Sequence, residues 1–116
     1  MSHQSETPLV REIMRAIGAL PGVLVYRNSQ GLAKHTDDHG KQWHVPYGLG
    51  AGTPDLIVFV WGQVVGLECK TLKGKARQNQ LDVQKAWRDA EATYEFVRDA
   101  ETAVSIVQNL RQRGER

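Results

Sequence analysis

The sequence contains little cysteine, little net charge and no long apolar run. Cys69 is the only cysteine in 116 residues, so no internal disulfide can form. No stretch approaches the ~18 apolar residues of a membrane span, and residues 1–6 are polar, unlike the apolar centre of a signal peptide. Basic residues exceed acidic ones only by 15 to 13, which excludes the global positive field of a protein that coats nucleic acid. We therefore expect a cytoplasmic protein with no membrane segment.

The length allows one hydrophobic core and excludes two. A chain of 116 residues has the usual size of a single domain, and its hydrophobic fraction of 41% is ordinary for a globular fold. We therefore treat residues 1–116 as one domain.

A predicted β-hairpin dominates the middle of the chain. Two runs rich in Val, Ile, Leu and Phe, residues 56–61 and 64–69, flank Gly62-Gln63. Glycine at the first central position suits a two-residue type II′ turn, which would set Trp61 opposite Val64. The turn thus predicts the register of the whole hairpin.

That register places three charged side chains on one face of the hairpin. Opposed residues point to the same side and side chains alternate with period two, so Asp55, Glu68 and Lys70 share a face. The other face is apolar and comprises Leu56, Val58, Val60, Val65, Leu67 and Cys69. Asp55 and Glu68 become diagonal neighbours, roughly 7–8 Å apart at the backbone, so both carboxylates can reach one ion. A hard divalent cation with oxygen ligands suits such a pair.

Basic residues follow this acidic pair directly. Lys73, Lys75 and Arg77 fall within eight positions of Lys70. A solvated loop is the ordinary explanation of such a cluster, but its position beside the carboxylates favours an anionic polymer as partner. We therefore select Lys73, Lys75 and Arg77 as DNA-binding candidates.

The first helix supplies a third acidic candidate. Its apolar stripe comprises Leu9, Ile13, Ala16, Ile17 and Leu20, and Pro8 is expected in its first turn. At 100° per residue, Glu6 falls about 40° from the centre of this stripe and Glu12 about 80°. Glu6 is therefore better aimed at the sheet, and Glu12 is the alternative.

A second helix carries a glutamine near the predicted site. Its stripe comprises Ala76, Val83, Ala86, Trp87 and Ala90, and Gln80 lies about 70° from the centre of that stripe. Gln84, one turn further on, is the alternative. Residues 93–98 then alternate as a strand, and a third helix follows with Asp99 as its N-terminal cap.

The segment before the central hairpin is rich in glycine and histidine. Residues 23–29 predict a strand that ends near Arg27 and Asn28, which we also select as DNA-binding candidates. Residues 32–36 and 41–45 suit a second hairpin, an arm that reaches along a bound duplex. Gly48, Gly50 and Gly52 would allow close approach to phosphates. The histidines and aspartates of residues 35–44 leave a transition-metal site as the alternative.

Two short motifs resemble a known nuclease family. Pro54-Asp55, followed after the hairpin by Glu68-Cys69-Lys70, resembles the PD-(D/E)xK signature. Residues 47–57, residues 25–29 and the glutamine-bearing helix resemble its VRR-NUC branch, over nearly the whole chain from Glu6 onward. Residues 35–44 depart from that pattern. The resemblance implies an α/β fold in which helices flank a mixed sheet, and it matches our predicted order α-β-β-β-α-β-α. It also implies a stand-alone VRR-NUC-like domain in a bacterial or phage-infected cell.

The resemblance implies metal-dependent hydrolysis of DNA, leaving 5′-phosphate and 3′-hydroxyl ends. Asp55, Glu68 and the backbone carbonyl of Cys69 would bind one or two Mg²⁺ ions, for which Mn²⁺ substitutes, and Glu6 would contribute directly or through water. Neighbouring carboxylates favour the charged form of Lys70, so we assign it to orienting water and stabilising transition-state charge. Gln80 would hold Lys70 or that water.

Stand-alone members of this family resemble junction resolvases. One chain holds one site, so cutting two strands of a four-way junction implies a homodimer, with Trp43, Tyr47 and Trp61 as candidate interface aromatics. Two alternatives remain open. One is a restriction-type nuclease that reads sequence, and the other is a non-catalytic DNA-binding module in which the acidic cluster merely balances the basic loop.

Overall fold

The computed structural model describes residues 2–114, and it describes the side chains of residues 7–113. In this part of the chain the elements run in the order α1 (Ser2–Gly18), β1 (Val23–Arg27), β2 (Gly31–Thr36), β3 (Gln42–Tyr47), β4 (Leu56–Val60), β5 (Gln63–Cys69), α2 (Gln78–Asp89), β6 (Thr93–Val97) and α3 (Ala100–Gly114). Without β2 and β3, this is the predicted order α-β-β-β-α-β-α.

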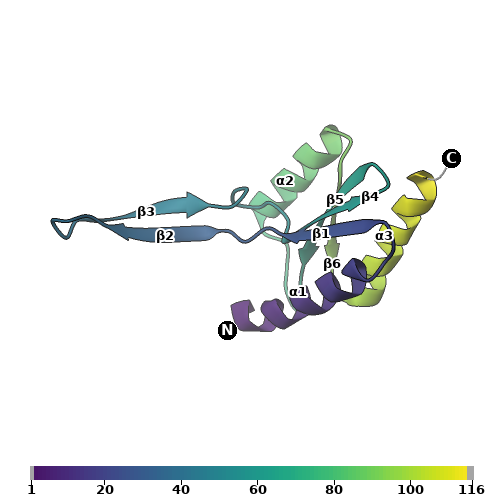
Figure 1. Cartoon of the computed structure of the whole chain (residues 1–116), viewed down its shortest axis with the longest axis horizontal. Coiled ribbons are helices and arrows are strands. Elements are labelled where there is room, and N and C mark those ends of the chain that lie inside the picture. Colours follow the sequence, from purple (N-terminus) through teal and green to yellow (C-terminus); the bar gives the residue numbers. More distant parts are fainter. Residues whose placement is uncertain (1, 115–116) are drawn as a thin grey trace.

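Four of the strands form a mixed sheet in the order β1-β4-β5-β6. β1 and β5 each pair antiparallel with β4, whereas β6 pairs parallel with β5. Helices α1 and α3 pack together against one face, and α2 packs over β6 on the other (Figure 1). The protein is therefore an α/β fold with a mixed sheet flanked by helices, as the sequence predicts.

The core lies between the sheet and helices α1 and α3. All six apolar hairpin residues that the alternation assigns to one face are buried there, and they pack with Val10, Ile13 and Ile17 of α1. Asp99 caps α3 as predicted, because its Oδ1 accepts a hydrogen bond of 2.7 Å from the backbone N–H of Thr102. The two-face prediction for the hairpin is thus confirmed.

The predicted turn of this hairpin is wrong by one position. Val60 pairs with Gln63, so Trp61 and Gly62 form the tip, and both have positive φ (50° and 80°), as in a type I′ turn. Val64 consequently pairs with Phe59 instead of Trp61, a shift of two residues. Because side chains alternate with period two, this shift leaves every side chain on its predicted face.

Two helices also differ from the sequence patterns. Helix α1 begins at Ser2, so Pro8 lies inside it rather than in its first turn, and the buried stripe includes Val10 where Ala16 was expected. Ala76 precedes α2 and Ala90 follows its last residue, while Ala86 within it is exposed. Helix α2 covers the sheet with few apolar side chains, chiefly Val83 and Trp87, which leaves polar residues at its inner border.

Strands β2 and β3 form the second predicted hairpin, residues 31–47, which we call the arm. Thr36 pairs with Gln42, and the turn is closed by Asp37, whose Oδ1 accepts hydrogen bonds of 2.9 Å from the N–H groups of His39 and Lys41. The arm projects away from the rest of the molecule, whose principal extents are 60 × 29 × 27 Å (Figure 1). Within the described residues, no helix is long and apolar enough to cross a membrane.

Candidate functional site

Three polar side chains are buried together where β5 ends and α2 begins. In the described part of the chain, the buried charged or amide side chains are Glu68, Lys70 and Gln80, with exposed fractions of 4%, 2% and 6%. Lys70 Nζ lies 3.7 Å from Glu68 Oε2, and Gln80 Nε2 donates a hydrogen bond of 2.9 Å to the same oxygen. Together with Asp55 we call these residues the carboxylate cluster.

The position of Gln80 is fixed by the start of α2. Its Oε1 accepts a hydrogen bond of 2.9 Å from the backbone N–H of Arg77, one half of a capping box. Gln84 instead donates to the backbone oxygen of Tyr94 at 3.0 Å, away from Glu68. The structure thus brings Gln80 and not Gln84 to the cluster. Gln80 contacts Glu68, however, whereas we expected it to hold Lys70 or a water.

Asp55 joins the cluster from the start of β4. Its Oδ2 accepts a hydrogen bond of 2.9 Å from the backbone N–H of Cys69, and its backbone oxygen accepts one of 2.8 Å from the N–H of Asn28. Leu56 pairs with Leu67, so the same register continued by one residue sets Asp55 directly opposite Glu68 instead of diagonal to it. The two carboxylates therefore belong to one end of the β4–β5 hairpin.

Tyr94 is a buried member of this region that the sequence did not indicate. Its hydroxyl donates a hydrogen bond of 2.8 Å to the backbone oxygen of Gly52. Burial, and then the negative charges of Glu68 and Asp55, raise the pKa of this hydroxyl. In the sequence, Tyr94 is only one aromatic residue in a predicted strand of alternating pattern. Its position near Asp55 and Glu68 results from the parallel pairing of β6 with β5, and this contact between distant segments has no local sequence signal.

The glycine-rich loop before Asp55 is held by Asn28. The side-chain amide of Asn28 donates to Thr53 Oγ1 at 2.8 Å and to the oxygen of Pro54 at 2.9 Å, and its Oδ1 accepts from the N–H of Leu49 at 3.2 Å. Both amide hydrogens are therefore used inside the protein. These bonds make Asn28 a clamp on the loop, and its selection as a DNA-binding residue stays a prediction.

Two of the three loop glycines allow the chain to approach itself. A Cβ at Gly48 would lie 2.4 Å from Cβ of Gln30, and one at Gly52 would lie 2.5 Å from the backbone oxygen of Asn79. Gly50 has nothing within 4 Å of that position. At Gly48 and Gly52 the space that a side chain would need is thus taken by the protein itself, and the approach of their backbone to phosphates stays a prediction.

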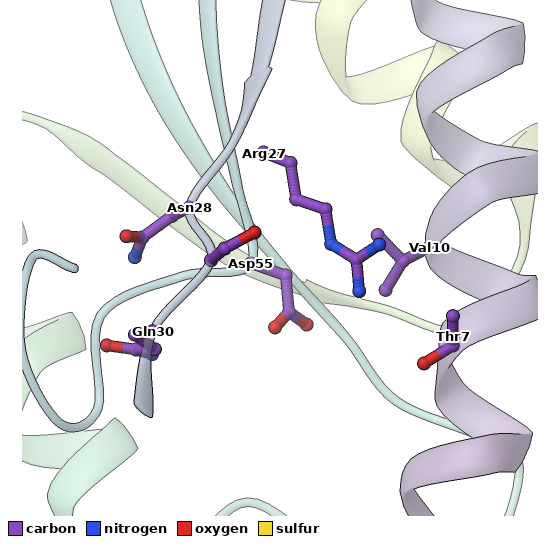
Figure 2. A pocket seen from close by; sticks show the side chains of 7 residues that line it. Thr7, Val10, Arg27, Asn28, Gln30 and Asp55 are labelled. Carbon is purple, nitrogen blue, oxygen red and sulfur yellow. The ribbon is translucent and has the colours of Figure 1, made fainter. Parts of the chain in front are cut away.

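A cavity of about 230 Å³ opens beside Asp55. It is lined by Thr7, Val10, Arg27, Asn28, Ser29, Gln30 and Asp55. Figure 2 shows the carboxylate of Asp55 and the guanidinium of Arg27 pointing into this hollow, while Asn28 points away from it. Arg27 is exposed at the end of β1. A phosphate group entering the cavity would meet the positive charge of Arg27 beside the carboxylate of Asp55.

Helix α1 forms one wall of this cavity through Thr7 and Val10. The side chain of Glu6, the predicted third acid, lies outside the described residues. Glu12 is exposed. The choice of Glu6 over Glu12 stays a prediction.

The predicted basic cluster divides into two parts. Lys70 is buried in the carboxylate cluster, whereas Lys73, Lys75 and Arg77 are exposed on the loop that leads into α2. The backbone N–H of Arg77 also donates a hydrogen bond to Oε1 of Gln80. A basic loop thus begins three residues after the cluster and faces solvent.

The donor set of the cluster suits a hard divalent cation. Such a cation prefers oxygen ligands, and Asp55, Glu68 and the carbonyl of Cys69 offer them at one end of the β4–β5 hairpin. No group of three or more His, Cys, Asp or Glu side chains gathers within the described residues. The predicted set contains only two described acidic side chains, Asp55 and Glu68, with the Cys69 carbonyl and Glu6 as further donors.

The histidine-rich segment forms the arm and makes contacts within it. The ring of His35 stacks on Trp43, with centroids 5.7 Å apart and an angle of 18° between the planes. Asp37 uses its carboxylate to close the turn. These contacts give His35 and Asp37 structural roles in the arm.

No protein-family model matches the sequence, and no curated protein matches it significantly. The resemblance to PD-(D/E)xK nucleases therefore remains one of short sequence motifs.

Proposed function

We propose that this chain is a metal-dependent DNA endonuclease with a PD-(D/E)xK-like core of the VRR-NUC type. The observation that carries the proposal is the burial of Glu68 and Lys70 beside Asp55, with Gln80 bonded to Glu68. Burying charges is costly, and a buried ion pair is often less stabilising than apolar residues of the same volume. The 3.7 Å separation of Lys70 and Glu68 also exceeds the roughly 2.7–2.9 Å of a strong charge-assisted bond. A binding or catalytic role explains this arrangement better than stability does.

The cluster supplies the groups that phosphodiester hydrolysis needs. Asp55, Glu68 and the carbonyl of Cys69 would hold Mg²⁺ or Mn²⁺, with Glu6 as a further ligand. When bound, the cation supplies Lewis-acid activation of the phosphate and a more acidic water. In the hydrolysis, the oxygen of a water oriented by Lys70 would form a bond to phosphorus while the bond from phosphorus to the 3′ oxygen breaks. The water would release a proton to solvent and the 3′ oxygen would take one from solvent, which leaves 5′-phosphate and 3′-hydroxyl ends.

Each protein side chain has a separate role in this reaction. The ammonium of Lys70 orients the water and stabilises charge on the phosphate oxygens. Gln80 keeps Glu68 in place, because its amide is itself fixed by the N–H of Arg77. Arg27 binds the phosphate from the other side of the cavity. Lys73, Lys75 and Arg77 bind the flanking backbone of the DNA.

The proposed substrate is branched DNA, in particular a four-way junction cut by two copies of the chain. A cleavage assay tests this on junction, flap, splayed and linear DNA, with Mg²⁺ and Mn²⁺ titrations. We expect metal-dependent cutting of branched DNA. Asp55→Asn should abolish cutting and retain binding, because an asparagine oxygen can still accept the hydrogen bond from Cys69. Glu101→Gln, an exposed change on α3, is the matched control and should cut normally.

Two outcomes would replace the proposal. Wild-type protein that binds DNA but cuts none of these substrates with either metal would indicate a non-catalytic module. Cutting of linear duplexes at one fixed sequence would indicate a restriction-type nuclease.

A further inference from the structure

A second cavity lies at the root of the arm. It has a volume of about 300 Å³, and we call it the root hollow; its lining includes Gln30, Leu32, Pro46, Gly50 and Ala51. This volume is at the lower end of the roughly 300–1,000 Å³ of small-molecule pockets. The described residues that line the hollow include no charged one. The hollow therefore suits a small neutral group with apolar surfaces better than a phosphate or a metal ion.

The arm and the loop that follows it both contribute to this lining. Leu32 pairs with Pro46 across β2 and β3, so the two side chains point to the same side of the ribbon. Leu32 is exposed by 65%, which leaves much of its apolar side chain open to a ligand. Gly50 and Ala51 line the hollow from the loop, and no other part of the chain comes within 4 Å of a Cβ built at Gly50. A thin group can therefore contact the ribbon and the loop together.

Hydrogen bonds hold the loop side of the hollow in place. Before Gly50, the N–H of Leu49 donates to Oδ1 of Asn28 at 3.2 Å. After it, the N–H of Thr53 donates to the backbone oxygen of Gly50, also at 3.2 Å. The root hollow is therefore formed before a ligand arrives, as most binding pockets are.

Gln30 lies between the root hollow and the cavity beside Asp55, because it lines both. Its Nε2 donates to the backbone oxygen of Thr53 at 3.3 Å, and its Oε1 lies 3.1 Å from Oγ1 of Thr53. Figure 2 shows this amide directed away from the carboxylate of Asp55. A glutamine amide has two N–H hydrogens and two oxygen lone pairs, and these contacts engage one of each. The exposed amide thus retains one donor and one acceptor for a ligand.

A nucleobase matches this combination of apolar walls and an amide. Its two faces are flat and apolar, and its edge carries hydrogen-bond donors and acceptors. Proteins that hold an unpaired base place it among apolar or aromatic side chains and bond to its edge. A glutamine amide can also pair with an adenine edge through two hydrogen bonds. The root hollow therefore has the chemistry of a site for a base.

The neighbouring cavity has room for the phosphate attached to such a base. Arg27 and Asp55 line that cavity, and Gln30 is common to both cavities. The base and the phosphate of a nucleotide are joined through a single sugar, so two adjoining cavities can hold one nucleotide. A peptide side chain in the root hollow would leave the cavity beside Asp55 unused. The contact between the two cavities thus favours nucleic acid over protein as the ligand.

We propose that the root hollow binds one unpaired nucleobase of the DNA strand whose phosphate enters the cavity beside Asp55. Leu32 and Pro46 contact a face of the base, and Gln30 forms hydrogen bonds with its edge. The choice of DNA rests on the proposed function. Binding of the base itself needs neither metal nor cleavage.

Binding of a base in the root hollow would select DNA by its structure. In a duplex every base is stacked and paired, and the free energy needed to take one out is least for a base that is already single-stranded. Flaps, splayed ends and open branch points would therefore bind more tightly than a perfect duplex. Because the apolar walls can contact any base, this selection would depend little on sequence.

Binding to two matched DNAs without divalent metal tests the inference. The DNAs are splayed duplexes that differ only in the unpaired nucleotides next to the branch, which carry thymine in one and no base in the other. Fluorescence anisotropy in the presence of EDTA measures both dissociation constants. Wild-type protein should bind the DNA with bases about tenfold more tightly, within the range that stacking of one base contributes.

Filling the hollow should remove this difference. Ala51→Leu places a larger side chain in the space for the base, so both DNAs should bind with the affinity of the abasic one. Leu32→Ala removes an apolar contact without adding volume and should reduce the preference severalfold. Ala86→Leu is the matched control, because Ala86 is exposed on α2 and does not line the hollow, and it should bind both DNAs as wild type does. Circular dichroism should show all three variants folded.

Three results would overturn the inference: equal affinity of wild type for the two DNAs, no binding of wild type to either, or an Ala51→Leu variant that keeps the full preference. Cleavage is scored in a separate assay. A protein that prefers the DNA with bases but cuts no DNA with Mg²⁺ or Mn²⁺ would retain the base site and lose the endonuclease. A protein that cuts both DNAs but binds them equally would do the reverse.

Discussion

The side-chain amide of Gln80 donates a hydrogen bond of 2.9 Å to Oε2 of Glu68, the oxygen that also lies 3.7 Å from Nζ of Lys70. One carboxylate oxygen is thus shared by an amide fixed at a helix start and by a buried ammonium. The position of Glu68 therefore depends on α2 as well as on its own strand. If Glu68 holds a cation, α2 takes part in building that site.

Removing the Gln80 amide should impair catalysis without unfolding the protein. A hydrogen bond to a charged group is worth roughly 1.5–3 kcal/mol. If the loss of this bond raises the free energy of the transition state by that amount, Gln80→Ala should lower kcat about ten- to a hundredfold. The measurement is kcat and KM on a cleaved DNA, together with the metal concentration at half-maximal rate.

Two further variants separate the roles of this side chain. Gln80→Glu keeps an acceptor for the N–H of Arg77 but loses the donor to Glu68, so the helix start should persist while activity falls. Gln84→Ala removes a bond to the Tyr94 carbonyl and should leave kcat unchanged. Equal losses for Gln80→Ala and Gln84→Ala would show that the effect comes from α2 in general.

Tyr94 should stabilise the loop that ends at Asp55. Tyr94→Phe removes the hydroxyl that donates to Gly52, and a neutral hydrogen bond contributes roughly 0.5–1.5 kcal/mol to folding. We expect a fall of that size in the free energy of unfolding, measured in urea, and weaker metal activation because the Asp55 loop is less fixed. Tyr26→Phe, an exposed change, is the control.

The pH dependence of stability provides a second measurement on Tyr94. Burial and the nearby carboxylates raise the pKa of its hydroxyl above the ordinary 10.0. Above that pH the unfolded chain releases this proton while the folded chain retains it, so the unfolded state binds fewer protons and stability falls as pH rises. The contribution is fully present at lower pH. Wild type should therefore lose stability more steeply than Tyr94→Phe in alkaline urea titrations, and parallel curves would contradict this.

Much of the carboxylate cluster was predictable from local pattern. Alternation in β4 and β5 assigns Asp55 and Glu68 to one face, and an error of two residues in the register does not alter that assignment. Helical periodicity likewise predicted that Gln80 lies at the border of the apolar stripe of α2. These features depend on residues close together in sequence.

What the sequence could not predict depends on contacts between distant segments. Tyr94 reaches Gly52 only because β6 lies parallel to β5, and Asn28 holds a loop more than 20 residues further along the chain. Gly52 is required by the approach of Asn79 from α2. The stripe assigned to α2 failed because that helix covers the sheet with few apolar side chains, so alanine spacing carried little information.

Glu6 and Glu12 offer a direct comparison of two acids on one helix. The helical periodicity of the sequence favours Glu6, and Glu12 is exposed in the structure. We expect Glu6→Gln to lower cleavage by roughly a hundredfold, which corresponds to about 2.7 kcal/mol of transition-state stabilisation. Glu12→Gln should cut at the wild-type rate. A loss confined to Glu12→Gln would reverse the assignment, and the comparison needs only parallel assays at saturating metal.

The exposed loop of Lys73, Lys75 and Arg77 should determine how binding depends on salt. Each phosphate contact that a protein makes with duplex DNA adds about 0.9 to the slope of log K against log salt, because a condensed counterion is released. Replacing all three residues by alanine should therefore reduce that slope by up to about 2.7 and weaken binding similarly for every DNA sequence. The control is Lys85→Ala, because Lys85 is also exposed but pairs with Asp89 at 2.7 Å on α2. Fluorescence anisotropy with a catalytically inactive Asp55→Asn background measures both slopes, and an unchanged slope in the triple variant would place the DNA elsewhere on the protein.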